Sequence, residues 1–350
     1  MTAFGWLPKI CAMAVLRHAK KSSVHLAHFL LSLTLLAPIP FALAQSTPVR
    51  VVATIGMVGD VAAELGGPCT AVTSLMGPGV DPHLYQATSG DVQALGRADL
   101  ILYAGLSLEG QLGSVLERFS TRTRTIAVSE RSVPEDLRVA ASSDRYAWDP
   151  HVWMDARLWS NVIPVIAGAL AEAAPACADA IHARAATYET EMLALHDWIA
   201  DATATIPAEQ RILVTAHDAF AYYGRAYGLE LAAIQGISTE SEASIADIRE
   251  TAQRIADAGV RAVFLETTIN PRTIQAVIDA AASLGATVAL GGDLYGDALG
   301  EPGTLAGTCL GMLYVNTRTI TRALGGTVPP LPSELQGWAD RSGATLEALP

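Results

Sequence analysis

The chain of 350 residues is poor in several features that define common protein classes. Its four cysteines include no Cys-x-x-Cys pair, so neither a zinc ribbon nor a thioredoxin-like redox site is indicated. The hydrolase motifs His-Glu-x-x-His and Gly-x-Ser-x-Gly are also absent. Acidic residues outnumber basic ones, with a net charge of -12, which argues against nucleic acids and anionic membranes as main partners.

Long apolar runs are missing except near the N-terminus, which also lacks acidic residues before Gln45. A basic stretch precedes an apolar run over residues 29–44 that two prolines interrupt and that is shorter than the ~20 residues of a spanning helix. The run ends in Ala-Leu-Ala, a signal peptidase pattern. We therefore expect residues 1–44 to be a signal peptide, cleaved near Ala44, and the mature protein to be periplasmic without a lipid anchor. An uncleaved anchor is the alternative, and initiation at Met13 is compatible with the length of the segment.

After this segment, short apolar runs alternate with helical patterns, except in the middle of the chain. This alternation predicts βαβ units and mostly parallel sheets. Predicted strands cover residues 50–55, 70–75, 99–105, 123–129, 211–216, 229–235, 260–266 and 286–292. The middle contains a helical segment that would span roughly 40 Å. We predict an α/β protein with two lobes, each with a mostly parallel sheet flanked by helices, joined by one long connecting helix. The expected boundaries are 45–174 for the N-terminal lobe, 175–204 for the helix and 205–350 for the C-terminal lobe.

Three histidines follow predicted strands, two of them behind the same dipeptide. His83 and His151 each stand behind Asp-Pro, and His217 comes directly after a strand. Ligands of open α/β sheets bind beyond the carboxyl ends of the strands, so these side chains can converge on one metal ion. In contrast, His182 and His196 lie within the long helix and are expected to be solvated surface residues.

The proline stiffens each Asp-Pro-His loop, and the aspartate either orients the imidazole or only forms the turn. A carboxylate usually completes a set of three neutral imidazoles around a divalent ion. Asp293 is our candidate because it follows the last predicted strand behind two glycines. The competitors are Asp297, Glu240 and Glu266.

Three cysteines remain in the mature chain, namely Cys69, Cys177 and Cys309. An odd number allows one internal disulfide and one free thiol. The sequence leaves the pairing open.

The chain resembles the solute-binding proteins of metal-ion ABC transporters, in the cluster that binds zinc or manganese. The resemblance rests on four stretches in the family's order, "GVDPHLYQATSGDVQAL", "WDPHVWMD", "VTAHDAFAYYGRAYGLELAAIQGISTESEAS" and "GGDLYGDALGEPG". It implies two lobes with the ion between them and the ligands His83, His151, His217 and Asp293. It also implies Zn²⁺ or Mn²⁺ as cargo, with Fe²⁺ possible, a membrane permease as partner, and no enzymatic activity. The long histidine-rich loop of many zinc-type members is missing, because residues 120–149 contain no histidine.

Two other functions stay open from the residues alone. Three histidines could hold a catalytic zinc in a secreted hydrolase, although a fourth ligand at Asp293 would close that site. A metal-binding adhesin on the same fold is the other alternative. For a transport protein we expect a monomer, and we expect release of the ion to depend on loops of the second lobe near His217 or Asp293.

Overall fold

The structure is a computed structural model that describes residues 47–141 and 146–342. The expected signal segment 1–44 and its cleavage site near Ala44 lie outside these residues. Within the described ranges, no helix has both the length and the apolar character needed to cross a bilayer.

The first sheet contains four parallel strands in the order β2-β1-β3-β4. The strands are β1 (Val49–Ala53), β2 (Thr70–Ser74), β3 (Leu100–Tyr103) and β4 (Arg124–Ala127). Each coincides with a predicted strand to within a few residues. The central strands β1 and β3 carry fully buried residues, as expected for a parallel sheet covered on both faces.

The second sheet repeats this layout, with four parallel strands in the order β6-β5-β7-β8. The strands are β5 (Ile212–His217), β6 (Glu230–Gln235), β7 (Ala262–Glu266) and β8 (Ala289–Leu294). In each sheet, the second strand along the chain, β2 or β6, therefore lies at one edge. The carboxyl ends of the strands point toward loops that carry the candidate residues. The predicted fold class is confirmed.

Helices connect the strands of each lobe and cover its sheet. The first lobe contains α1 (Gly56–Gly66), α2 (Ser89–Arg97), α3 (Gly113–Ser120), α4 (Val128–Ser132), α5 (Ala156–Trp159) and α6 (Val162–Ala173). The second contains α8 (Ala221–Tyr227), α9 (Ile245–Ala258), α10 (Arg272–Ser283), α11 (Cys309–Ala323) and α12 (Gln336–Ser342). Reciprocal capping boxes, Thr88 with Asp91 and Ser244 with Asp247, define the starts of α2 and α9.

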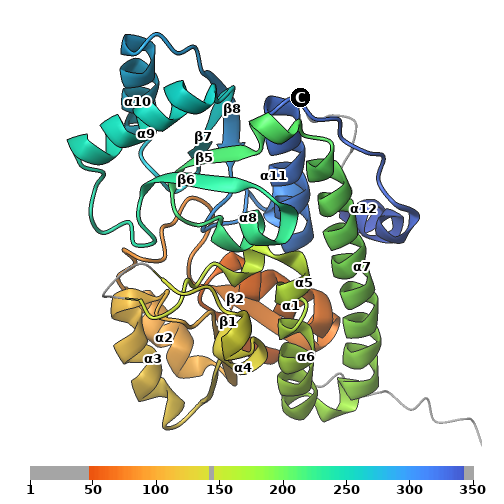
Figure 1. The fold of residues 1–350 in the computed structure, drawn as a ribbon. Coiled ribbons are helices and arrows are strands. Elements are labelled where there is room, and N and C mark those ends of the chain that lie inside the picture. Colours follow the sequence, from red (N-terminus) through yellow and green to blue (C-terminus); the bar gives the residue numbers. More distant parts are fainter. Residues whose placement is uncertain (1–46, 142–145, 343–350) are drawn as a thin grey trace, which may run out of the picture. The chain divides into compact units, whose positions relative to one another are not determined.

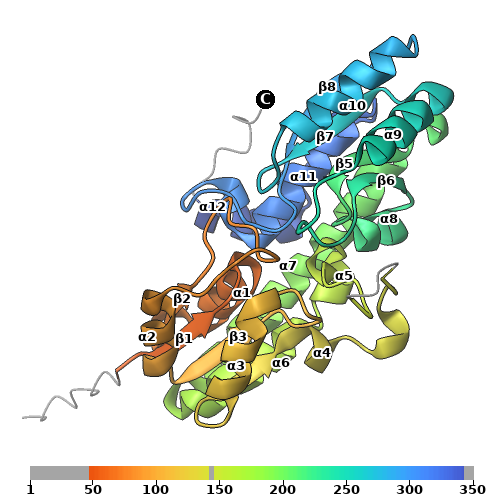
Figure 2. The ribbon, with the colours of Figure 1, turned by 90° about the vertical axis from the view of Figure 1, so that its left-hand side faces the viewer.

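Helix α7 (Ala178–Ala204) runs alongside both sheets, as Figures 1 and 2 show in green. A short 3-10 turn, Pro175–Cys177, precedes it. Its buried face follows helical spacing through Ile181, Ala185, Tyr188, Met192, Leu195, Ile199 and Ala202. It packs against α1, α5 and α6 of the first lobe and against α8 and α11 of the second. The long connecting helix therefore packs against both lobes.

A disulfide joins Cys69, just before β2, to Cys177, just before α7. Among the residues that the structure describes, Cys309 is the free cysteine, and it is buried at the start of α11. The bridge closes the first lobe on the long helix and resolves the pairing that the sequence leaves open.

The main buried hydrophobic cluster extends through both lobes and α7, from Val51 in β1 to Phe264 in β7 and Leu310 in α11. A smaller cluster lies within the second lobe, between its sheet and helices α9 and α10. Because the main core crosses from one sheet to the other, our lobe boundaries of 174 and 204 remain a prediction.

Candidate metal centre

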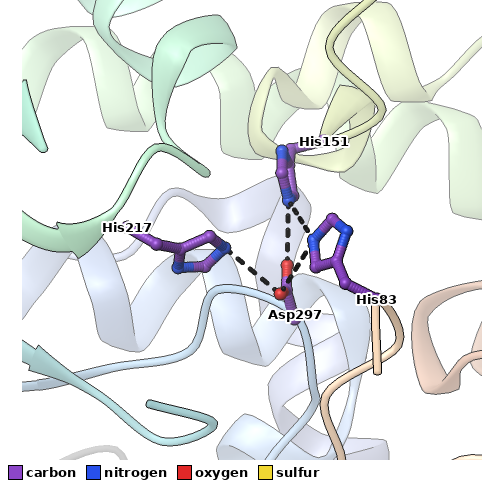
Figure 3. A group of neighbouring side chains, drawn as sticks. All are labelled: His83, His151, His217 and Asp297. Carbon is purple, nitrogen blue, oxygen red and sulfur yellow. Dashed lines mark hydrogen bonds and ion pairs between the residues drawn. The ribbon is translucent and has the colours of Figure 1, made fainter. Parts of the chain in front are cut away.

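The three candidate histidines meet in one buried group, shown in Figure 3. His83 lies in the loop after β2, His151 stands just before a 3-10 turn, and His217 is the last residue of β5. The Nε2 atoms of His83 and His151 are 3.3 Å apart, and the ring of His217 lies 5.4 Å from that of His151 between centroids. All three side chains are fully buried.

Asp297 is the carboxylate that joins these rings. Its Oδ1 lies 3.0 Å from Nε2 of His151, and its Oδ2 lies 3.2 Å from Nε2 of His217 and 3.4 Å from Nε2 of His83. One ligand atom from each of the four residues lies within 4.8 Å of all the others. Both carboxylate oxygens of Asp297 therefore face the space between the rings.

Asp293, our candidate from the sequence, is not part of this group, and we correct that expectation to Asp297. Strand β8 continues to Leu294, past the glycine pair where we ended the predicted strand. Asp293 therefore lies within β8, opposite Leu265 of β7, with an exposed side chain. The chain leaves the strand after Leu294, and the loop that follows directs Asp297 inward.

The two other carboxylates that competed for this role lie elsewhere. Glu240 is exposed in the loop after β6. Glu266 is buried at the end of β7, but it contacts His217 from behind and does not reach the centre of the group.

Each histidine ring is held at its Nδ1 atom, which lies within 3.0 Å of an oxygen on another side chain. The pairs are His151 with Asp149 at 2.7 Å, His217 with Glu266 at 2.8 Å, and His83 with Tyr146 at 3.0 Å. Such partners fix the orientation of the imidazole and leave the lone pair of Nε2 free for a metal ion. Sequence reasoning considered Asp149 and Glu266 but missed Tyr146, which no local pattern connects to His83.

The two Asp-Pro-His segments use their aspartates differently. In both, the aspartate accepts the backbone N–H of the histidine two residues later, at 2.9 Å for Asp81 and 2.8 Å for Asp149. Asp149 also contacts the ring of its own histidine, whereas Asp81 accepts a hydrogen bond from Thr239 of the second lobe at 2.6 Å. The motif is therefore a turn in both places and an imidazole support only in the second.

The electrostatics of the group favour bound positive charge. Burial lowers the pKa of His151, but the charges of Asp149 and Asp297 raise it by a larger amount, so that the pKa is about 9. The pKa of His217 is raised in the same way, against burial, by Glu266 and Asp297. Burial raises the pKa of Asp297, yet the three imidazoles hold it well below its usual range. The buried carboxylates thus require compensating charge, from protons on the rings or from a cation in their place.

The donor set fits a transition-metal ion. Both oxygens of Asp297 and both ring nitrogens of His217 are buried without a hydrogen bond of good geometry among the described residues, although they lie within ion-pair distance of the neighbouring groups. The Nε2–Nε2 and Nε2–oxygen distances of 3.0–3.4 Å resemble the ligand separation of roughly 3.3 Å in a tetrahedral zinc site.

Residues around the group tie the two lobes together. Nε1 of Trp153 donates to the carbonyl of Gly296, next to Asp297, at 2.9 Å. The hydroxyl of Tyr222 in α8 donates to the carbonyl of Asp149 at 2.9 Å. The ligand loops of one lobe are therefore positioned in part by side chains of the other.

The remaining histidines of the described chain stay outside the group. His182 is exposed on α7, as expected. His196 is half-buried instead of solvated, because its Nδ1 lies 3.2 Å from the hydroxyl of Tyr227. Burial lowers the pKa of His196.

The fold and the group of three histidines and one aspartate define a two-lobe metal-binding protein. The family of ZnuA, the periplasmic component A of zinc uptake, matches residues 51–323. The chain therefore belongs to this family of periplasmic solute-binding proteins.

Individual relatives of the chain are named as metal-binding proteins. The chain is 41% identical over 275 residues to the manganese-binding lipoprotein MntA of Bacillus subtilis, covering 79% of this chain and 89% of that protein. It is 42% identical over 274 residues to the zinc-binding protein TroA of Treponema pallidum, covering 78% and 88%. The solved structure of the periplasmic zinc-binding protein TroA from Treponema pallidum matches with a TM-score of 0.77 and covers 79% of this chain and 99% of that one. The Fe(III)-bound YtgA structure from Chlamydia trachomatis matches with a TM-score of 0.73 at 27% identity, covering 81% and 100%.

Proposed function

We propose that this protein is the solute-binding component of an ABC transporter and that it captures a divalent transition-metal ion between its two lobes. The observation that carries the proposal is the convergence of His83, His151, His217 and Asp297, two from each lobe, on one buried centre. The protein delivers the ion to a membrane permease, and its mature form acts in the periplasm as a monomer. The ZnuA-family match and the names of the relatives support this role.

The same geometry argues against a zinc hydrolase. A catalytic zinc keeps one position open for a water molecule, whereas here Asp297 supplies a fourth protein ligand. The nearby carboxylates Asp149 and Glu266 contact the rings at Nδ1, on the side away from the centre. They are positioned to orient the ligands and not to act as a base on a metal-bound water. We therefore assign the protein no catalytic step.

The donor set accepts more than one metal. Three imidazoles and one carboxylate oxygen suit tetrahedral Zn²⁺. Because both oxygens of Asp297 face the centre, binding through both raises the coordination number and accommodates Mn²⁺ or Fe²⁺ as well. Relatives named for manganese, zinc and iron are 41%, 42% and 30% identical to the chain. Intrinsic affinity at such a site should rise from Mn²⁺ through Fe²⁺ to Zn²⁺, so availability decides the cargo.

Titration of the metal-stripped mature chain tests metal capture. We expect one ion of Zn²⁺ or Mn²⁺ per chain, with a dissociation constant below micromolar. The variant His217→Ala should lose this binding, whereas His182→Ala, which alters an exposed histidine on α7, should keep it. Binding no tighter than micromolar, or equal losses in both variants, would contradict the proposal.

Cells that lack the gene test the transport role. Their accumulation of the bound metal should fall, and the wild-type gene, but not the gene encoding His217→Ala, should restore it. Full restoration by the variant would show that metal binding at this site does not serve uptake.

A further inference from the structure

The metal centre is sealed in this structure, so an ion needs a path to it. The side chains of all four ligands are fully buried. A cleft of about 800 Å³ on the surface has His83 and Tyr146 among its lining residues. Of the four ligands, His83 alone belongs to this lining. The cleft therefore borders one identifiable ligand.

His83 is also the ligand whose ring is held by a neutral partner. The rings of His151 and His217 contact the buried carboxylates of Asp149 and Glu266 at Nδ1. The ring of His83 contacts a tyrosine hydroxyl instead. A hydrogen bond between neutral groups is roughly half as strong as one to an ionised group. The ring nearest the cleft is therefore the one that turns away at the smallest cost.

Asp297, by comparison, stands on a packed loop. The preceding Gly296 accepts the hydrogen bond of Trp153, and a Cβ at Gly296 would lie 2.4 Å from the carboxylate of Glu266. This packing restricts the loop on the side of the second lobe.

The charge of the cleft suits a cation. Its lining contains Glu130 and Glu240, together with the buried Glu109, and no lysine or arginine among the described residues. Burial raises the pKa of Glu109 to about 7, so the negative charge comes mainly from the other two. A cleft lined by one sign of charge raises the local concentration of the opposite ion and its rate of association. The same lining would repel anions.

A second cavity offers a rival path. It measures about 400 Å³ and its lining includes Asp218 and Gly236 in the second lobe, but none of the four ligands. An ion on that side would have to pass behind His217, whose ring and backbone Glu266 contacts.

We propose that the ion reaches and leaves the centre through the cleft at His83, and that Tyr146 is a positioning residue whose hydroxyl restrains the His83 ring and sets the rate of exchange. This inference rests on the proposed function, because it assumes that the centre binds a metal. It places the moving ligand in the first lobe, opposite to our expectation of release near His217 or Asp293.

The path is tested by narrowing each cavity in turn. A Cβ added at Gly113, in the lining of the cleft, or at Gly236, in the rival cavity, meets no atom within 4 Å. We expect Gly113→Phe to slow both uptake and release of Zn²⁺ by about the same factor, so that the dissociation constant stays unchanged. Gly236→Phe should leave both rates unchanged. Gln111→Trp, also in the cleft, serves as a second variant if Gly113→Phe fails to fold.

The role of Tyr146 is tested by removing its hydroxyl. Tyr146→Phe should raise the rate of Zn²⁺ release to a chelator by roughly 3- to 10-fold, the factor expected for one hydrogen bond. The matched control is Tyr223→Phe, which removes a buried hydroxyl that contacts Thr317 in α11, and it should leave the rate unchanged. Equal melting temperatures of the metal-free variants would separate positioning from a loss of stability.

The outcomes distinguish the two proposals. If the wild-type chain binds no metal, the proposed function fails. If it binds tightly, but Gly236→Phe slows exchange and Gly113→Phe and Gln111→Trp do not, the path is wrong. If release from Tyr146→Phe matches that from Tyr223→Phe, Tyr146 does not position His83.

Discussion

Glu266 makes two contacts with the single residue His217. Its Oε1 accepts the backbone N–H of His217 at 2.8 Å, and its Oε2 lies 2.8 Å from Nδ1 of the ring. Because Glu266 ends β7 and His217 ends the neighbouring strand β5, the pair connects two strand ends and orients the ring at the same time. One carboxylate therefore couples the second sheet to the metal centre.

Replacing Glu266 by glutamine should weaken metal binding without emptying the site. The amide keeps the shape of the side chain but removes the charge that orients the imidazole and raises its basicity. We expect the affinity for Zn²⁺ to fall by about 10- to 100-fold, measured by competition with a chelator. The control is Glu189→Gln at an exposed position of α7, and an equal loss there would contradict a specific role for Glu266.

Asp60 makes the stability of the fold depend on pH. Its carboxylate in α1 accepts the backbone N–H of Cys309 in α11 at 2.8 Å. Burial and the charge of Glu64 together raise the pKa of Asp60 to about 7, although the hydrogen bonds from Cys309 and Tyr188 lower it. In the unfolded chain, the pKa of this aspartate is ~3.9. Between these values the folded state holds the proton more tightly, so stability from this group is present below about pH 4 and falls as the pH rises to about 7.

The variant Asp60→Asn removes this titration and keeps an oxygen that can accept the N–H of Cys309. Between pH 5 and pH 8, the melting temperature of the metal-free wild type should fall by roughly 2–4 °C more than that of the metal-free variant. Asp293→Asn, at an exposed position, should behave like the wild type. Parallel pH profiles of the wild type and Asp60→Asn would rule out a raised pKa at Asp60.

The disulfide between Cys69 and Cys177 should contribute to stability and not to metal binding. It closes a sequence separation of 108 residues and lies at the starts of β2 and α7, away from the ligand loops. The double variant Cys69→Ser, Cys177→Ser should lower the free energy of unfolding by about 2–4 kcal/mol in denaturant titration. Its affinity for Zn²⁺ should match that of the wild type, and a comparable loss of affinity would show that the bridge shapes the site.

Much of the fold follows from patterns that are local in the sequence. Short apolar runs bounded by turn residues mark the eight strands of the described residues. The central strands β1, β3, β5 and β7 are mostly buried, and a strand covered on both faces must be continuously apolar. Because His217 directly follows such an apolar run, the sequence also predicts that it lies at the carboxyl end of a strand, where ligands of open α/β sheets bind.

The site is predictable only where its residues follow such local patterns. The difference between Asp293 and Asp297 depends on where β8 ends, and the run of glycines hides that the strand continues to Leu294. The contact of Tyr146 with His83 and the pairing of Cys69 with Cys177 join segments that are distant in sequence. Such contacts are set by the tertiary packing of the first lobe and its junction with α7, which one sequence does not reveal.

The most direct test of the metal centre compares two aspartates four positions apart. Asp297→Ala should lower the affinity for Zn²⁺ on the order of 100-fold or more, since losing a ligand exceeds the loss of its supporting contacts. Asp293→Ala should bind as tightly as the wild type, because its side chain is exposed in β8. Loss of binding in Asp293→Ala together with wild-type affinity in Asp297→Ala would contradict the assignment.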